Sequence, residues 1–184
     1  DLARIPEVLS MEQAPEDEEQ MWKLLSEAVE KAAEKLAEAR SQEGERLKAD
    51  LLGKLDYMEG LVDFIEGRSP VVLQEYRAKL EDKVKELLEN SLIDEGRIAA
   101  EVILYADKIC VDEELVRLRS HIHATRAELE HGGGVGRKLD FIAQEMNREA
   151  NTILSKSGDL EVSDRAIGLK TEIEKVREQI QNIE

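Results

Sequence analysis

Apolar side chains recur every three or four positions along most of this 184-residue chain, and no segment alternates apolar and polar residues as a half-buried strand does. That spacing places apolar side chains on one face of an α-helix. The composition agrees, since 37% of the residues are charged and only 3% are aromatic, which is typical of long helices. The sequence therefore predicts an all-α fold, in which long antiparallel helical hairpins pack as a bundle.

Three parts are distinguishable along the chain. Residues 1–15 are predicted to be irregular, and residues 16–92 to form a long helical hairpin region. Within that region, Gly67–Pro70 is predicted to end one helix and start the next, because glycine ends helices and proline fits a first turn. Residues 93–184 are predicted to form a C-terminal helical domain, whose first helix spans about 95–130.

The C-terminal domain is predicted to continue through a glycine loop at 132–134 to two further helices. Apolar residues of the last helix alternate strictly by four and three positions. This spacing is typical of a coiled-coil seam that packs along another helix or another subunit. The seam consists of Val162, Ala166, Leu169, Ile173, Val176, Ile180 and Ile183.

The formal net charge of −16 argues against a nonspecific nucleic-acid binder, because attraction to phosphates dominates such binding. The charge is unevenly spread, however. Between residues 132 and 160 the charges balance, so a local neutral or cationic patch on an acidic body is expected. The basic and acidic members of this stretch are Arg137, Lys138, Arg148, Lys156, Asp140, Glu145, Glu149 and Asp159.

The single cysteine, Cys110, lies in an apolar helical stripe and is predicted to be a small core residue. One cysteine forms no internal disulfide, which fits a reducing compartment. No apolar stretch of about 18 residues occurs, so no membrane span is expected. These features predict a cytoplasmic protein.

The helix predicted over residues 135–156 carries the most unusual side chains of the chain. An apolar stripe from Leu139 to Ile153 steps by three and four residues, and two polar rows run beside it. Asparagine and threonine are mediocre helix formers, so their presence predicts either a buried polar network or a site. One row holds Asp140, Gln144, Asn147 and Asn151, and the other holds Glu145, Arg148, Glu149, Thr152 and Lys156.

A second polar stripe precedes this helix in the sequence. On one face of the helix predicted over about 95–130 it brings together Asp107, Glu114, Arg117, His121 and Glu128. Two carboxylates four residues apart, Glu145 and Glu149, together with a histidine from this stripe suit a divalent cation such as Mn²⁺ or Mg²⁺. The alternative is a solvated face on which Arg148 is an ion-pair partner.

Arg137 and Lys138 follow Gly136 at the start of the helix predicted over residues 135–156. Free backbone N–H groups and the positive end of the helix dipole favour anions, so a phosphate is a candidate ligand there. The alternative is a loop with two solvated side chains. The sequence contains no Walker loop, dinucleotide fingerprint, zinc-ligand spacing or nucleophile elbow.

The segments VGRKLDF, QEMNREANT and SKS, with the terminal REQIQNIE, resemble the C-terminal part of the bacterial YicC/YloC family. EGERLKADL and EELVRLRSHI fit the same family in order, so the resemblance covers the chain from about residue 40 onward. It implies a metal-dependent endoribonuclease that cuts single-stranded regions of RNA and assembles as a ring-like homo-oligomer, a hexamer. The residues that match are Glu114, Arg117, Leu118, His121, Gly136, Arg137, Leu139, Asp140, Phe141, Gln144, Glu145, Asn147, Arg148, Glu149, Asn151, Thr152, Ser155 and Lys156.

The resemblance also implies a β-containing N-terminal domain that this chain lacks. Residues 1–15 are then a linker from that domain. We expect the missing domain to supply part of the RNA groove, in which case this portion is inactive without it.

From the resemblance we predict roles for three groups of residues. Glu145 and Glu149, with His121 and Glu114, are predicted to hold or orient the Mn²⁺ or Mg²⁺ ion as the catalytic group. Alternatively, His121 acts as a general base, for which an imidazole is suited near neutral pH. The predicted phosphate contacts and supporting residues are Arg137, Lys138, Arg148 and Lys156, and Asp140, Gln144, Asn147 and Asn151 respectively.

Two other classes of function fit the same sequence. In one, the chain is a helical oligomerisation module. The polar side chains of the helix over residues 135–156 then form a buried network that fixes the register of helix packing, as buried asparagine residues can do. In the other, it is an RNA-binding adaptor that directs RNA to other nucleases without cutting. Strong loss of stability on Glu149→Ala or Arg148→Ala, with cleavage retained, would indicate the first. RNA that is bound but never shortened would indicate the second.

Overall fold

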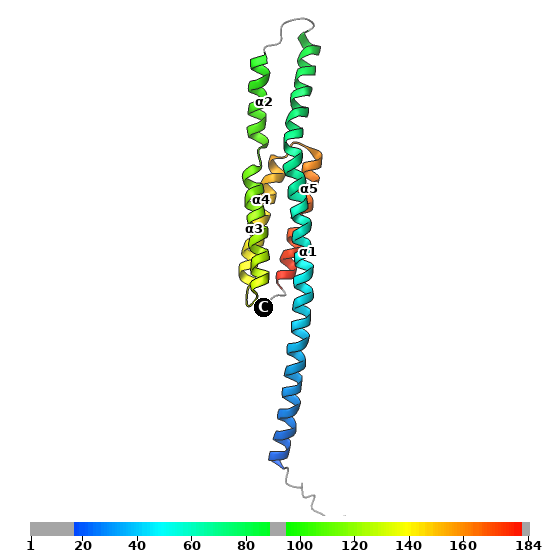
Figure 1. Cartoon of the computed structure of the whole chain (residues 1–184), viewed down its shortest axis with the longest axis vertical. Helices are drawn as coiled ribbons and strands as arrows, with labels where there is room; N and C mark the ends of the chain where they lie inside the picture. The colour runs from blue at the N-terminus through cyan, green and yellow to red at the C-terminus, as the bar shows by residue number, and fades with distance from the viewer. Residues whose placement is uncertain (1–16, 89–94, 182–184) are drawn as a thin grey trace, which may run out of the picture. The chain divides into compact units, whose positions relative to one another are not determined.

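The structure, a computed structural model, describes residues 17–88 and 95–181, which form five α-helices and no strand (Figure 1). The all-α prediction is therefore confirmed for the described residues, and none of their helices is long and apolar enough to cross a membrane. The segment predicted as an irregular linker, 1–15, lies outside the described residues. The helices are α1 (Glu18–Leu88), α2 (Glu95–Ile109), α3 (Asp112–His131), α4 (Gly136–Lys156) and α5 (Leu160–Ile180).

The chain divides into two compact units, Asp1–Glu45 and Arg46–Glu184. In the first unit the described residues belong to the beginning of α1, whose large apolar side chains are exposed. These side chains are Met21, Trp22, Leu24, Leu25, Val29 and Leu36. Exposed apolar side chains in such number are typical of an interaction surface.

The second unit holds the hydrophobic core, built by α3, α4, α5 and the part of α1 from Arg46 onward. Helix α4 packs against both α3 and α5. The predicted seam of α5 is buried in this core from Val162 to Ile180, whereas Ile183 lies outside the described residues. The largest fully buried side chains are Leu51, Leu55, Met58, Ile65, Leu115, Leu118, Ile122, Leu139, Met146, Ile153, Leu169 and Ile173.

Helix α1 runs without interruption through Pro70, so the predicted stop and restart at Gly67–Pro70 is wrong. Proline removes one backbone donor from a helix and crowds the preceding turn. Contacts on both sides offset this cost. Ile65 and Val72 are buried, and the Arg68 guanidinium spans the proline to donate to both carboxylate oxygens of Glu75 at 2.8 and 3.0 Å.

The helix predicted over about 95–130 is two helices, because α2 ends at Ile109 and α3 begins at Asp112. Three acidic residues open α3, where the positive end of the helix dipole favours negative charge. The prediction of a core position for Cys110 is also wrong, since its side chain is exposed at this break. In Figure 1, α2 and α3 follow one another in line, and Tyr105 of α2 stacks on Tyr76 of α1 with ring centroids 3.7 Å apart.

The predicted glycine loop joins α3 to α4. Gly132 and Gly133 have φ angles of 71° and 87°, a left-handed backbone conformation that favours glycine. The loop is short enough to turn the chain sharply, so that α4 returns along α3. In this antiparallel pair, the polar stripe of α3 lies next to α4.

Candidate active site

Charged side chains of α3 and α4 meet in three cross-helix ion pairs. We name this boundary the α3–α4 seam. The paired residues are Glu114, Arg117 and Glu128 of α3 and Lys138, Glu149 and Lys156 of α4, and His121 and Glu145 share these helix faces by their spacing. At one end, the Lys156 ammonium donates to the Glu114 carboxylate at 2.9 Å and to the Cys110 carbonyl at 3.0 Å. In the middle, Arg117 lies 3.6 Å from the Glu149 carboxylate. At the other end, Lys138 lies 2.6 Å from Glu128.

The ion pairs fix where His121 lies along the seam. Moving from Arg117 to Glu128 along α3 corresponds to moving the same number of residues back along α4, from Glu149 to Lys138. Counted from these two pairs His121 is level with Glu145, whereas counted from the Glu114–Lys156 pair it is level with Glu149. It therefore lies beside the part of α4 that carries these two carboxylates. Its imidazole is half-buried, and no hydrogen bond or ion pair joins it to another described residue.

Two of the seam carboxylates are buried. Glu114 is 7% exposed and Glu149 is 5% exposed, and such side chains require a partner when charged. Burial by itself raises the pKa of Glu114, but the hydrogen bond from Lys156, a backbone hydrogen bond and the charges of Lys156 and Arg117 together hold that pKa below its ordinary value. Glu114 is thus ionised at neutral pH.

The second oxygen of Glu114, Oε2, is buried and has no hydrogen-bond partner among the described residues. An ionised buried carboxylate with one free oxygen is able to accept a proton or a hydrogen bond from a substrate. Lys156 is held in the complementary state, since the hydrogen bond to Glu114 raises the pKa of its ammonium. This end of the seam therefore combines a free acceptor with a fixed positive charge.

The proposed metal ligands Glu145, Glu149 and His121 are not gathered into one site. In the described part of the chain, no three His, Cys, Asp or Glu side chains are arranged so that they could hold a metal ion. The buried carboxylates are instead paired with cations, Glu149 with Arg117 and Glu114 with Lys156. The residues of one chain, as described, do not fit a divalent cation at this position.

The four cationic side chains predicted to contact phosphates differ in their exposure and in their ion-pair partners. Arg137 is exposed and forms no ion pair with another described residue. Arg148 is 77% exposed and has a single distant partner, Glu145, at 3.9 Å. Lys138 and Lys156 are engaged with Glu128 and Glu114. The arginines are therefore available to a ligand, whereas the lysines belong to the seam.

The predicted supporting residues do not form one buried network. Asp140 accepts hydrogen bonds from Arg177 of α5 at 3.0 Å and from Gln144 at 2.7 Å. Gln144 and Asn151 are exposed, and Asn147 is half-buried with its Oδ1 atom buried and without a partner in the described residues. Asp140 thus ties α4 to α5, which is a structural contact on the side away from α3.

Arg117 is a seam residue for which the sequence predicted no role. It contacts Glu113 within α3 and Glu149 across the seam, and both contacts raise the pKa of its guanidinium, the hydrogen bond with Glu113 being the largest cause. The sequence signal was its place between Glu114 and His121 on the same helical face. Its partner on α4 was not predictable, because the sequence of neither helix determines the register in which the two helices pack.

Comparison with known proteins identifies the family to which this sequence is similar. The family model described as "Endoribonuclease YicC-like, C-terminal" matches residues 65–184, and the model "Endoribonuclease YicC-like, N-terminal region" matches residues 1–49. The C-terminal match includes the whole α3–α4 seam.

Two curated relatives are similar over most or all of the chain. A protein of Clostridioides difficile (strain 630), described as "Probable endoribonuclease YicC", is 45% identical over 184 residues, which is 100% of this chain and 63% of that protein. One of Haemophilus influenzae (strain ATCC 51907 / DSM 11121 / KW20 / Rd), with the same description, is 43% identical over 145 residues, 79% of this chain and 50% of that protein. The chain therefore spans only part of the length of these relatives. On these matches, the chain belongs to the family of YicC-like endoribonucleases.

Proposed function

We propose that this chain is the helical part of a cytoplasmic endoribonuclease that hydrolyses phosphodiester bonds in single-stranded regions of RNA, with its chemistry in the α3–α4 seam. The observation that carries the proposal is the seam itself. Two buried carboxylates, Glu114 and Glu149, are held there by cations, and His121 lies between them and the Lys138 end. The descriptions of the two relatives as probable endoribonucleases support the reaction class.

His121 is the proposed proton-transfer group. Its half-buried imidazole is not bound to any other described side chain, so it is free to take a proton from a ribose hydroxyl or a water. Glu145, on the neighbouring part of α4, is the proposed orienting carboxylate. Arg117 and Lys156 provide fixed positive charge beside the developing negative charge of a pentacoordinate phosphate.

A Mn²⁺ or Mg²⁺ ion stays a prediction from the family resemblance. Because the described side chains do not assemble a metal site, no step of the proposed chemistry passes through a cation. Chelation separates the two mechanisms. Cleavage that persists in EDTA and leaves 2′,3′-cyclic phosphate ends would support histidine acid–base chemistry, whereas cleavage abolished by EDTA and restored by Mn²⁺ would support the cation.

The test compares cleavage of a labelled single-stranded RNA by the full-length protein and by its His121→Ala variant. We expect the variant to cleave about 100-fold to 10,000-fold more slowly, which is the usual contribution of a positioned acid or base, with RNA affinity retained. His123→Ala is the matched control, because His123 is 67% exposed and faces Glu59 of α1 rather than the seam. Equal rates for the wild type and His121→Ala would overturn the proposed role.

A homo-oligomer, a hexamer in the family resemblance, is the proposed state in solution. The exposed apolar side chains of the first unit, from Met21 to Leu36, support an assembly of copies, since monomeric proteins rarely expose large apolar patches. Multi-angle light scattering of the wild type and of a Leu25→Glu variant measures the mass directly. An unchanged mass at the monomer value in both would contradict the proposal.

A non-cleaving RNA-binding adaptor is the second candidate. It is favoured by the two arginines of α4 that remain free for a ligand, Arg137 and Arg148. If purified protein retards labelled RNA in a gel under all metal conditions and never shortens it, the adaptor function replaces the nuclease.

A further inference from the structure

The side of α4 that faces away from the core carries one continuous row of exposed side chains. The steps between its members are four, three, four, three and four residues, which keeps them on one face of the helix. We name it the outer row. It consists of Arg137, Phe141, Gln144, Arg148, Asn151 and Ser155.

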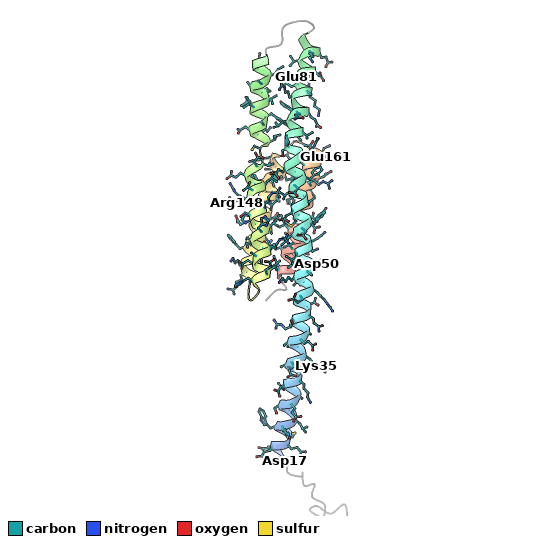
Figure 2. All side chains as sticks on the ribbon, in the orientation of Figure 1. Asp17, Lys35, Asp50, Glu81, Arg148 and Glu161 are labelled. Carbon is teal, nitrogen blue, oxygen red and sulfur yellow. The ribbon has the colours of Figure 1, made fainter. Side chains whose placement is uncertain are left out.

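The outer row differs from the seam in its chemistry. It contains two arginines, two amides, a hydroxyl and an aromatic ring, and no carboxylate, in a chain whose formal net charge is −16. Arg137 has no ion-pair partner among the described residues, and Arg148 has only Glu145 at 3.9 Å. Figure 2 shows Arg148 at the outer edge of the α3–α4 pair. The row is thus a cationic strip on an acidic protein.

Phe141 is the unusual member of the row. It is 62% exposed, whereas the other phenylalanine of the chain, Phe64, is half-buried under the guanidinium of Arg165 at 4.7 Å from its ring centroid. With about 1.5 Å of rise per residue, Phe141 lies roughly 6 Å along the helix axis from Arg137 and roughly 10 Å from Arg148. An uncovered ring is therefore flanked by a cation on each side.

We propose that the outer row binds single-stranded RNA, with a base stacked on the Phe141 ring and the neighbouring phosphates on Arg137 and Arg148. This inference rests on the proposed function, in which RNA is the substrate. Proteins that bind single strands combine a cationic track with aromatic rings on which bases stack, and every base offers such a face. The amides of Gln144 and Asn151 are suited to the exposed edges of unpaired bases.

The composition of the row favours RNA over a second copy of the chain. The buried centre of a protein–protein interface is predominantly apolar and depleted of charge. The outer row offers a single apolar side chain, Phe141, between polar and charged neighbours. A base stacks on one ring, whereas a subunit interface needs a larger apolar area.

The experiment measures the affinity of the full-length protein for a fluorescently labelled, unstructured RNA oligonucleotide by anisotropy, with gel controls for intact RNA. We expect Phe141→Ala to bind between about 5-fold and 150-fold more weakly, the range for loss of one stacked base. Phe141→Tyr is expected to bind as the wild type does. Phe141→Leu, which keeps the apolar volume and removes the aromatic face, is expected to bind as weakly as Phe141→Ala.

Matched controls separate stacking from general effects of mutation. Ile167→Ala removes an exposed apolar side chain from α5 and is expected to leave affinity unchanged. Arg148→Gln is expected to flatten the dependence of affinity on salt, and Arg77→Gln, an equal change of charge on α1, is not. RNA containing 5-iodouridine is expected to photo-crosslink to the peptide that contains Phe141.

The outcomes distinguish this inference from the proposed function. Wild-type protein that neither binds nor cuts RNA would remove the proposed function and with it this inference. If the wild-type protein cuts RNA, and Phe141→Ala and Phe141→Leu bind RNA as tightly as the wild type does, only the proposed role of the outer row is overturned. A change of oligomeric mass in Phe141→Ala, measured by light scattering, would reassign the row to contact between copies and overturn it too.

Discussion

At the scale of single residues, the seam shows two buried carboxylates that differ in how closely a cation approaches them. Glu114 and Glu149 are both nearly inaccessible, but Glu114 accepts a close hydrogen bond from Lys156 at 2.9 Å, whereas Glu149 lies 3.6 Å from Arg117. A buried charge that loses its partner keeps its desolvation cost without compensation. Substitutions in these pairs are therefore expected to affect stability as well as activity.

Replacing Lys156 by methionine removes the partner of Glu114. We expect the free energy of unfolding to fall by about 1–3 kcal/mol, the cost of leaving a buried acceptor unpaired. Urea denaturation followed by circular dichroism measures the change. Adding Glu114→Gln to Lys156→Met is expected to recover part of the loss. Lys85→Met, at the exposed pair with Asp82, is the control and should change little. Equal effects at both lysines would contradict the prediction.

The lowered pKa of Glu114 predicts how stability depends on pH. In the unfolded chain this carboxyl titrates near its ordinary value of 4.5, and in the folded protein its pKa is lower. The contribution of Glu114 is then fully present above pH 4.5 and is lost as pH falls through the folded pKa, because the unfolded chain binds the proton first.

The corresponding measurement is the free energy of unfolding between neutral and acidic pH for the wild type and Glu114→Gln. The difference between the two proteins is expected to shrink as the pH falls below 4.5. Asp164→Asn, at an exposed position, is the control. A difference that stays constant over the whole range would show that Glu114 is not held ionised by its partners.

At the scale of elements, α4 has a separate task on each side. Its apolar stripe enters the core, one polar side meets α3, Asp140 reaches Arg177 of α5, and the outer row faces solvent. The buried network predicted by the structural alternative is therefore absent from the described residues as a single feature. The polar side chains divide among two helix contacts and an exposed surface.

This division predicts that two neighbouring substitutions change the free energy of unfolding by different amounts. Glu149→Ala removes a buried, paired carboxylate and is expected to destabilise the protein by about 1–3 kcal/mol. Arg148→Ala, at a side chain that is 77% exposed, is expected to leave stability within about 0.5 kcal/mol. Thermal and urea unfolding of both variants provide the measurement. Large and similar losses would instead support the register-fixing network.

The continuity of α1 through Pro70 is also testable. Pro70→Ala restores a backbone donor and removes the ring, which relieves a cost of about 3 kcal/mol in a helix interior. Alanine also gives the unfolded chain more conformational freedom, which lowers the free energy of unfolding by up to about 1 kcal/mol. We expect a net gain of about 1–2 kcal/mol in the free energy of unfolding. If Pro70 instead began a new helix, where proline is favoured, the substitution would lower stability.

At the scale of the whole molecule, the core belongs to one of the two units. All buried apolar residues of the described chain lie at Leu51 or later, inside the unit Arg46–Glu184. A chain trimmed to residues 46–184 is therefore expected to keep a cooperative thermal transition, since no buried apolar side chain is removed. Circular dichroism against temperature measures this. The absence of a cooperative transition would contradict it.

The sequence by itself determined the class of the fold and which side chains share each helix face. Helical spacing is a local property, so the apolar faces, the glycine loop and the buried positions from Val162 to Ile180 were readable from it. The polar stripe containing Glu114 and His121 was also readable, because residues three, four and seven apart share a helix face whatever surrounds them.

Only the tertiary structure decided what lies opposite each face. The continuity of α1 at Pro70 depends on Arg68 and on buried neighbours, and the exposure of Cys110 depends on the break between α2 and α3. The pairing of Arg117 with Glu149 follows from the register of α3 against α4. That register is set by the summed packing of side chains far apart in the sequence, which local periodicity does not contain.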